Sequence, residues 1–471
     1  MIKLESVESL WFKKMVQSLE ERLEYLERRI SELEAENKAL RSENEKLKLE
    51  NAELQERLGL TSKNSSIPSS KELYKSKKSE KKSSGRKRGG QAGHKGHFRK
   101  SMEADEIINV EMENTLCQCG GELCIHGQAH THQTVDIPAI KPYVIDYQLT
   151  RYRCNKCGKK KKAPLPAGVS KDTFGNNISV VISALTAFYK NSRRDVQNIL
   201  RNIFNVDISL GSISNREGKV SEKCKEAYED LESTINNSNI VHIDETSHSN
   251  SGKRGWCWLF ASEDATLIKL EQSRGKKVLK ASPFGEDDSI YITDRYAAYN
   301  YFDEEMRQVC WAHLRRDFTR FTGSSYAEVR KYGIYLEQVA LELFALRNAL
   351  FAEQIEILYF KRRAYKLRRR AWYYLNQIAY LPDAQNAARK AKTIMKAEDM
   401  MWRFLYDPYS IPLTNNHAEQ QIRHYVVYRK NSYFTQSERG NRFLERLMSL
   451  FLTWKKTDQN PFLQLSNLVT A

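Results

Sequence analysis

Three carboxylates of this chain lie where they could form one catalytic site. Asp244 and Asp294 each follow a short run of apolar and β-branched residues, a pattern that predicts a strand. Glu419 lies in the first turns of a predicted helix, which Thr414 or an asparagine could cap. An aspartate after a strand is most often a turn residue. Three acids from separate elements, however, can hold two Mg²⁺ ions in an all-oxygen cage suited to phosphoryl transfer, and Mn²⁺ could replace Mg²⁺.

Several strands and helices must position these acids. A polar turn at 250–253 separates two predicted strands and indicates a hairpin. At 307–316 a short strand turns into a basic helix, where Cys310 and His313 lie one turn apart; alone, they fit a core residue and a helix cap better than a metal site. The predicted strands are 240–246, 255–260, 266–270 and 289–294, and 326–406 is predicted to be almost wholly helical.

Cysteines gather in one part of the chain. Five of the eight lie between Cys117 and Cys157, which favours a metal site over disulfides in a reducing compartment. Two short turns, 117–121 and 154–158, supply four thiols with glycines close behind, as tetrahedral zinc sites do. The second turn has Cys-x-x-Cys spacing, and the first is one residue shorter. The expected zinc ligands are Cys117, Cys119, Cys154 and Cys157; substitutes for the first pair are Cys124, His126, His130 and His132, and free buried cysteines are the alternative.

The first sixty residues carry a regular heptad repeat. Leucine recurs at every seventh residue from Leu19 to Leu54, which predicts a coiled coil. Asn37, Asn44 and Asn51 occupy successive positions of the other seam, where a buried amide favours a parallel, in-register dimer. No basic helix precedes the seam, so the pattern indicates an oligomerisation helix rather than a basic zipper. We therefore expect a homodimer or a higher oligomer.

The composition indicates a polyanionic partner. The 471 residues include 76 Lys and Arg against 59 Asp and Glu, a net charge of +17, and such an excess is typical of nucleic-acid-binding proteins. The Ser-, Lys- and Gly-rich segment after Leu60 cannot form a core; it is a linker, a phosphate-binding arm, or both. The sequence has neither a membrane-spanning stretch nor a signal peptide, so we expect a cytoplasmic protein without a membrane partner.

Two further segments are candidates for DNA binding. Between 176 and 223 the apolar residues have helical spacing, and the turn at 205–209, with Arg193, Arg194 and Arg201 nearby, resembles a helix-turn-helix. Packing within a small helical bundle explains this pattern equally well. The cationic stretch 361–370, in which tyrosine and arginine interleave, suits either a solvated face or nucleic acid.

Over nearly its whole length the chain resembles the bacterial DDE transposases of the insertion-sequence family IS66. The leucine-rich first helix and the cysteine turns contribute to this resemblance. Its other motifs are Gly-Gly-Gln-Ala-Gly-His-Lys-Gly-His at 89–97, Asp-Glu-Thr at 244–246, Cys-Trp-Ala-His-Leu-Arg-Arg at 310–316, Asn-Asn-His-Ala-Glu at 415–419 and Arg-Lys-Asn at 429–431. The family commonly has arginine after the glutamate, where this chain has Gln420.

The resemblance implies an RNase H-like α/β catalytic core with Asp244, Asp294 and Glu419 as its triad and metal ligands. It also implies a helical insertion within that core and helper proteins from the same element. The expected fold is a multidomain α+β chain. Its expected parts are a coiled-coil helix (1–60), a basic linker (61–105), a zinc-binding domain (106–170), a helical helix-turn-helix-like region (171–236), the first part of the core (237–320), the insertion (321–408), and the second part of the core with C-terminal helices (409–471).

The predicted function is DNA transposition. Such an enzyme cleaves DNA at transposon ends and joins the freed 3′-hydroxyl to target DNA. The predicted DNA contacts are Arg86, Lys87, Arg88, Arg315, Arg316, Arg423, Arg429 and Lys430. One alternative is a catalytically inactive or repurposed transposase that acts as a sequence-specific DNA-binding protein, although the presence of all three acids favours an active enzyme. A second is an RNase H-like nuclease or resolvase without strand transfer, which would use the same metal chemistry.

Overall fold

The computed structural model describes residues 4–58, 99–113, 116–282 and 289–470. The chain divides into two compact units: the smaller holds Lys75–Ala163 and Ile199–Asp207, and the larger holds Met1–Tyr74, Pro164–Asn198 and Ile208–Ala471. The predicted DNA contacts Arg86, Lys87 and Arg88 lie outside the described residues. None of the described helices has an apolar stretch long enough to span a bilayer.

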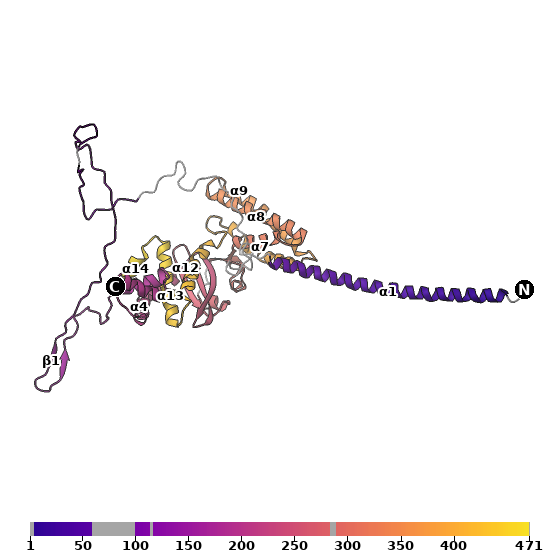
Figure 1. Ribbon diagram of the computed structural model, residues 1–471, viewed down its shortest axis with the longest axis horizontal. Helices are drawn as coiled ribbons and strands as arrows, with labels where there is room; N and C mark the ends of the chain where they lie inside the picture. Colours follow the sequence, from indigo (N-terminus) through magenta and orange to yellow (C-terminus); the bar gives the residue numbers. More distant parts are fainter. Residues whose placement is uncertain (1–3, 59–98, 114–115, 283–288, 471) are drawn as a thin grey trace. The chain divides into compact units, whose positions relative to one another are not determined.

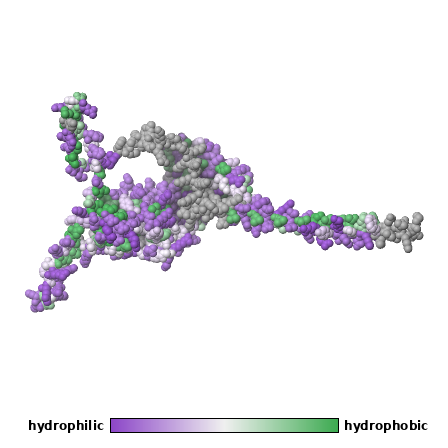
Figure 2. Space-filling view, viewed as in Figure 1, coloured by the Kyte–Doolittle hydropathy of each residue, from purple (hydrophilic) through white to green (hydrophobic). Residues whose placement is uncertain are grey.

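The amino-terminal helix is present as predicted. α1 (Leu4–Leu58) is a single continuous helix. Its heptad leucines from Leu19 to Leu54 remain between 43% and 55% exposed, and Figure 2 shows apolar residues recurring along this helix. A row of exposed leucines gains burial only against another surface. Pairing of α1 in a coiled coil therefore stays a prediction.

In the smaller unit, a two-stranded hairpin carries the second cysteine turn. β1 (Arg151–Arg153) pairs antiparallel with β2 (Lys160–Lys162), and the turn between them contains Cys154 and Cys157. Almost all described residues between 99 and 163 are exposed, so apolar burial contributes little to this segment.

Helices occupy the segment between 176 and 236, as the apolar spacing up to 223 predicts. Ser209 caps the helix that begins at Leu210: its Oγ accepts a hydrogen bond from the amide of Ser212, at 3.0 Å. Two of these helices flank residues 203–209, which include the predicted turn of the helix-turn-helix at 205–209. The elements are α2 (Asn176–Ser183), a π-helical continuation η2 (Ala184–Phe188), α3 (Arg193–Asn202), α4 (Leu210–Lys223) and α5 (Lys225–Asn236).

A mixed five-stranded sheet forms the centre of the larger unit, with strand order β5-β4-β3-β6-β7. The first three strands in the chain form an antiparallel meander, and the last two are parallel to the first. All four predicted strands and the short one near 307 are confirmed. They are β3 (Ile240–Asn250), β4 (Lys253–Ala261), β5 (Thr266–Glu271), β6 (Ile290–Thr293) and β7 (Arg307–Val309).

One detail of the strand prediction is wrong, because Asp244 does not end its strand. β3 continues through polar residues to Asn250, since its second half pairs antiparallel with β4 up to the pair Asn250–Lys253. Within this half, His248 is buried, and its ring lies 2.5 Å from the hydroxyl of Tyr425. The parallel pairing with β6, in contrast, stops at His242.

Helices cover both faces of the sheet. On one face, α12 (Asn416–Ser432) and α13 (Glu438–Lys456) pack on β3, β4 and β5, and their apolar residues share one core with these strands (Figure 1). On the other face, the short helix α6 (Lys277–Lys280) and the 3-10 segment η3 (Ala297–Tyr301) contribute Leu279 and Tyr299 to a second core. A 3-10 turn η4 (Glu304–Met306) and the helix α14 (Pro461–Thr470) complete this part.

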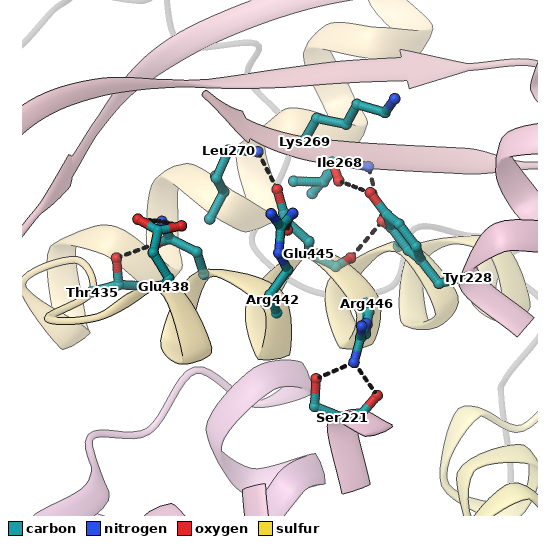
Figure 3. Close-up of polar contacts among 12 residues, drawn as sticks. Ser221, Tyr228, Ile268, Lys269, Leu270, Thr435, Glu438, Arg442, Glu445 and Arg446 are labelled. Carbon is teal, nitrogen blue, oxygen red and sulfur yellow. Dashed lines mark hydrogen bonds and ion pairs between the residues drawn. The ribbon is translucent and has the colours of Figure 1, made fainter. Parts of the chain in front are cut away.

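A row of polar side chains on α13 accepts hydrogen bonds from the backbone amides on the outer edge of the edge strand β5. Thr453, Ser449 and Glu445, spaced at four-residue intervals on one helix face, accept hydrogen bonds from the amides of Thr266, Ile268 and Leu270, at 3.0, 2.8 and 2.6 Å. Figure 3 shows the contact between Glu445 and Leu270. An unpaired strand edge would otherwise expose these amides. The row explains why polar side chains are buried in an apolar helix.

The chain between Asp294 and Glu419 is mostly helical, as predicted. α7 (Trp311–Thr322) follows β7, and α8 packs between α7 and α9 (Figure 1). Trp311 anchors this part: it is fully buried, and its ring nitrogen donates to the carbonyl of Met401, at 2.7 Å. The remaining elements are α8 (Ala327–Phe351), α9 (Ile357–Ala379), α10 (Gln385–Met395), α11 (Glu398–Met401) and the 3-10 turn η5 (Arg403–Leu405).

Candidate active site

The sheet register brings Asp244 and Asp294 to the same edge and the same face. His242 pairs with Ile292 in the parallel ladder between β3 and β6. Asp244 and Asp294 each lie two residues further on, and side chains two residues apart in a strand share a face. They therefore project beside each other where the parallel pairing ends, at the carboxyl ends of strands where open α/β sheets place their ligands.

The two aspartates differ in their surroundings. Burial and the neighbouring charges of Glu245 and Asp294 raise the pKa of Asp244 well above its ordinary value. Its Oδ1 accepts a hydrogen bond from the amide of Glu245, at 2.9 Å. Oδ1 of Asp294 accepts from the amide of Tyr296, at 2.7 Å. Burial first, and the neighbouring acids second, thus disfavour the charged form of Asp244.

Glu245 is an acid of the site region whose role the sequence does not predict. Its side chain is 2% exposed and accepts hydrogen bonds from Nη2 and Nε of Arg274, at 2.7 and 3.0 Å, and from the hydroxyl of Tyr299. Burial and the charge of Asp294 nevertheless raise its pKa to about 7. The guanidinium of Arg274 also lies over the ring of Tyr296, 3.9 Å from its centroid. Hydrogen bonds from Arg274 and Tyr299 thus hold Glu245, the residue after Asp244, in place.

Asn415 connects the start of α12 to the strand that carries Asp244. Its Nδ2 donates to the carbonyl of Ile243, at 2.7 Å, and its Oδ1 lies 3.0 Å from Nδ1 of His242. Its amide donates to Sγ of Cys310, at 3.1 Å. The predicted capping of this helix by a side chain is wrong: Asn415 is at the cap position, but its side chain makes no capping bond, because β3 engages both of its polar atoms.

Glu419 faces two basic side chains of α7. Nδ1 of His313 lies 3.6 Å from its Oε1, and Nη2 of Arg316 lies 3.6 Å from its Oε2. These separations are too long for hydrogen bonds. Oε1 of Glu419 and Nδ1 of His313 are buried and, within the described residues, have no hydrogen-bond partner. A buried polar atom without a partner is costly, so Oε1 of Glu419 is available to bind a ligand.

The oxygens of the three predicted acids are not all within metal-sharing distance. In the described part of the chain, the one group whose ligand atoms lie within 4.8 Å of one another is Cys310, His313 and Glu419. Burial raises the pKa of the Cys310 thiol to about 11. Nη1 of Arg316 lies 3.3 Å from Nε2 of His313, and a guanidinium there opposes a second cation. We therefore interpret this group as the surroundings of Glu419 rather than a separate metal centre.

The three carboxylates Asp244, Asp294 and Glu419 suit Mg²⁺ better than the group of Cys310, His313 and Glu419 does. The charges of Asp294 and Glu419 both contribute to the raised pKa of Asp244, so the three acids act on one another. Mg²⁺ prefers carboxylate oxygens and keeps several waters, so it needs few protein ligands in direct contact. The unpartnered Oε1 of Glu419 supplies a free ligand atom on the third element.

The predicted DNA contacts around this site fall into two groups. Arg423 and Lys430 are exposed, and Arg315 is exposed with Nη2 3.5 Å from Glu337. Arg429 instead connects α12 to β3, because its Nη1 donates to the hydroxyls of Thr246 and Ser247, at 2.9 and 2.7 Å. Its structural role leaves fewer donors for phosphate.

A cleft of about 520 Å³ opens beside Glu419, between α7, α8 and the start of α12. Two arginines of α7, Arg315 and Arg316, line it together with Thr414 and Asn416. Phe344 of α8 contributes an apolar wall. One acid, Glu337, also lines the cleft and lies 3.5 Å from Arg315, and Arg316 faces Glu419 as well. With two arginines and one acid, the cleft is large enough for part of a polyanionic ligand.

The helix-turn-helix arginines are partly engaged. Arg193 pairs with the buried Glu217, with Nη2 at 2.7 Å from Oε2. Nε of Arg201 lies 2.6 Å from Asp207. DNA binding by this region stays a prediction.

Both cysteine turns form in the smaller unit. The amide of Gly120 donates to the carbonyl of Cys117, at 2.9 Å, and the amide of Gly158 to that of Cys154, at 3.0 Å. Both glycines have positive φ, 87° and 75°, which glycine adopts at little cost. Hydrogen bonds from neighbouring amides lower the pKa of the Cys154 thiol, which suits a thiolate ligand. The four predicted thiols do not form one cluster within the described residues, and a shared zinc ion would have to bring the turns together.

Comparisons with known proteins agree with this arrangement. Residues 192–442, more than half of the chain, match the family described as "Transposase IS66 family" and include Asp244, Asp294 and Glu419. Residues 114–158, which contain the four predicted zinc ligands, match the "zinc-finger binding domain of transposase IS66". Residues 27–100 match a family of unknown function, DUF6444.

A relative named "Uncharacterized protein y4qI", from Sinorhizobium fredii (strain NBRC 101917 / NGR234), is 27% identical over 248 residues. The match covers 47% of this chain and 44% of that relative, so the chain spans less than half of the relative's length. The family match, in contrast, includes the sheet, the helical stretch and α12. This chain belongs to the IS66 family of transposases.

Proposed function

We propose that this transposase cleaves DNA at transposon ends and joins the freed 3′-hydroxyl to target DNA, with Asp244, Asp294 and Glu419 as its catalytic acids. The observation that carries this proposal is their convergence. Asp244 and Asp294 each lie two residues beyond the last pair of the parallel ladder, His242 and Ile292, and Asn415, hydrogen-bonded to β3, sets the start of the helix that carries Glu419. Their mutual electrostatic effect on Asp244 supports one shared site.

Each acid has a distinct part in the proposal. Asp244 and Asp294 would hold metal ions from the sheet, and Glu419 would complete the site from α12. A pair of Mg²⁺ ions there would activate the attacking water or 3′-hydroxyl and stabilise the attacking and leaving oxygens during in-line displacement. Arg316 and His313, which already face Glu419, would orient its carboxylate, and the guanidinium of Arg316 would also neutralise phosphate charge.

We also propose an RNase H-like core and a DNA path along the basic side of the site. The mixed sheet with helices on both faces supports the first point. The second rests on the cleft beside Glu419, where Arg315 and Arg316 present donors suited to phosphate. Arg423 and Lys430 on α12 would extend this surface, and Arg429 would act mainly through β3.

The remaining parts of the chain would organise the complex. The exposed leucine seam of α1 supports pairing with a second chain through a coiled coil. The cysteine turns support a structural Zn²⁺ ion. We further propose that helper proteins from the same element take part and that the domain limits lie at 60, 105, 170, 236, 320 and 408.

Cleavage and joining assays separate this proposal from its two alternatives. The wild-type chain, with any helper proteins, is incubated with labelled DNA that carries the element's own ends, in Mg²⁺ or Mn²⁺. Cleavage followed by joining to target DNA is the expected result. Cleavage without joining would favour a nuclease or resolvase, and tight binding without chemistry in either metal would favour a DNA-binding protein derived from a transposase.

A further inference from the structure

The helix α9 exposes a face that its role in the helical stretch does not require. Its inner side is apolar, with Phe360, Leu367 and Leu375 almost fully buried. Seven lysines and arginines and not one acid occur in its sequence. A face that serves solubility alone usually mixes charges of both signs. The one-sided charge of α9 therefore indicates a negatively charged partner.

Four cations of this helix are free to contact such a partner. Arg368 pairs with Glu398 and Asp399, and Arg370 pairs with Glu342, 2.8 Å away. The exposed cations Arg362, Arg363, Lys366 and Arg369 have no ion pair or hydrogen bond within the described residues. At helical spacing these four positions lie on one side of α9.

Large aromatic side chains lie among these cations. Tyr365 and Trp372 are 51% and 45% exposed and lie seven residues apart, two helical turns and roughly 10.5 Å along the axis. Neither ring contacts another ring or forms a hydrogen bond in the part of the chain that the structure describes. Tyr359 and Tyr373, 49% and 54% exposed, lie on the same side. Exposed rings of this size mark an interaction site rather than a surface made only for solubility.

We infer that this side of α9, the α9 face (Tyr359, Arg362, Arg363, Tyr365, Lys366, Arg369, Trp372 and Tyr373), binds single-stranded DNA; the inference rests on the proposed DNA function. Cations that follow a backbone and rings that stack on bases are the two features of single-strand binding sites. Duplex DNA would use the cations alone, because its base faces are already stacked. The spacing of Tyr365 and Trp372 corresponds to about three nucleotides at about 3.4 Å each.

Unpaired DNA is a ligand that end cleavage itself would supply. Once one strand is cut at a transposon end, a strand end is free to separate from the duplex. α9 belongs to the same compact unit as the acids, and its neighbour α8 lines the cleft beside Glu419. The α9 face would hold the separated strand, and the helical stretch would thereby gain a function in the reaction.

Fluorescence anisotropy on the full chain tests this inference. An oligothymidine strand and a duplex of equal length are titrated with wild type, with Tyr365→Ala/Trp372→Ala, and with Arg362→Gln/Arg369→Gln. Loss of the two rings is expected to weaken single-strand binding about tenfold or more and duplex binding less than twofold. Loss of the two arginines is expected to weaken binding of both DNA forms. The slope of log affinity against log salt concentration should also become shallower, by about one to two.

Matched controls and a direct probe complete the test. Tyr189→Ala/Tyr406→Ala removes two exposed rings elsewhere, 62% and 73% exposed, and Lys277→Gln/Lys280→Gln removes two cations of α6; neither pair should reproduce the selective loss. An oligothymidine with 5-iodouracil should crosslink to Tyr365 or Trp372. Equal weakening of both DNA forms by Tyr365→Ala/Trp372→Ala, or crosslinks found only outside the α9 face, would overturn the inference.

Failure of the proposed catalysis would look different. Single-strand binding and crosslinking should persist in Asp244→Asn, which removes a catalytic acid and leaves α9 intact. If wild type bound neither DNA form, both the α9 inference and the proposed DNA function would be wrong. Binding of single strands without cleavage would leave the α9 face supported and contradict only the catalytic proposal.

Discussion

Nδ2 of Asn415 donates to the carbonyl oxygen of Ile243, at 2.7 Å, one residue before the proposed catalytic Asp244. The two residues are 172 positions apart in the chain. Because Asn415 directly precedes α12, this bond fixes where Glu419 stands relative to β3. Asn415 is therefore a positioning residue for the proposed triad.

Replacement of Asn415 should reduce both stability and cleavage. Asn415→Leu removes the partners of the Ile243 carbonyl and of His242, and each buried unpaired group costs about 1–3 kcal/mol. We expect the free energy of unfolding to fall by about 2–6 kcal/mol for the two groups together and cleavage to fall at least tenfold while DNA affinity persists. Denaturant unfolding and end cleavage measure the two effects. Asn416→Leu, at the exposed neighbour, is the control for stability; equal losses in both variants would contradict the positioning role.

The buried Glu445 makes stability depend on pH. Burial raises its pKa to about 7, above the ordinary 4.5. In the unfolded chain this carboxyl loses its proton above pH 4.5, whereas in the folded chain it keeps the proton until about pH 7. The free energy of unfolding therefore falls as the pH rises between these two values, by up to about 1.4 kcal/mol per pH unit. Glu445→Gln keeps an oxygen for the amide of Leu270 (Figure 3) and should remove this part of the slope. Identical slopes in wild type and variant, measured by urea unfolding from pH 5 to 8, would refute the argument.

Zinc content tests the cysteine turns. Cys154→Ser should lower bound zinc by one equivalent per chain, because three thiolates hold zinc less well than four. Cys124→Ser, at another exposed cysteine of the same unit, should leave zinc unchanged if Cys117 and Cys119 are the first pair. Elemental analysis of the purified variants gives the answer. Loss of zinc in Cys124→Ser would instead make Cys124 a ligand in place of one of the contracted pair.

The asparagines of α1 should set its oligomeric state. Asn37→Leu, Asn44→Leu and Asn51→Leu together replace three amides of the predicted seam with leucine, which removes the constraint that favours an in-register dimer. The mass by light scattering is expected to rise above that of wild type. An unchanged mass would show that these amides do not specify the assembly.

Local sequence patterns predict many of the strands and helices. The parts of the fold that depend on contacts between distant residues could not be predicted in this way. The β-branched residues before Asp244 and Asp294 predict their strands, and the heptad leucines predict α1. The continuation of β3 past Asp244 was not predictable from its polar residues, because it depends on pairing with β4 and on the burial of His248 against Tyr425. The roles of Asn415 and Glu245 were missed for the same reason: their partners lie 29 or more positions away.

The most direct test of the proposed site is strand cleavage at labelled transposon ends in Mg²⁺ by three near-isosteric variants. Asp244→Asn, Asp294→Asn and Glu419→Gln remove one charge each and keep the size of the side chain. The control Asp317→Asn alters an acid of α7 that pairs with Arg295 and Lys390. We predict that each of the three variants binds DNA but loses cleavage at least a hundredfold, whereas the control stays within tenfold of wild type. Cleavage near the wild-type rate in any of the three would contradict the assignment of that residue to the catalytic site.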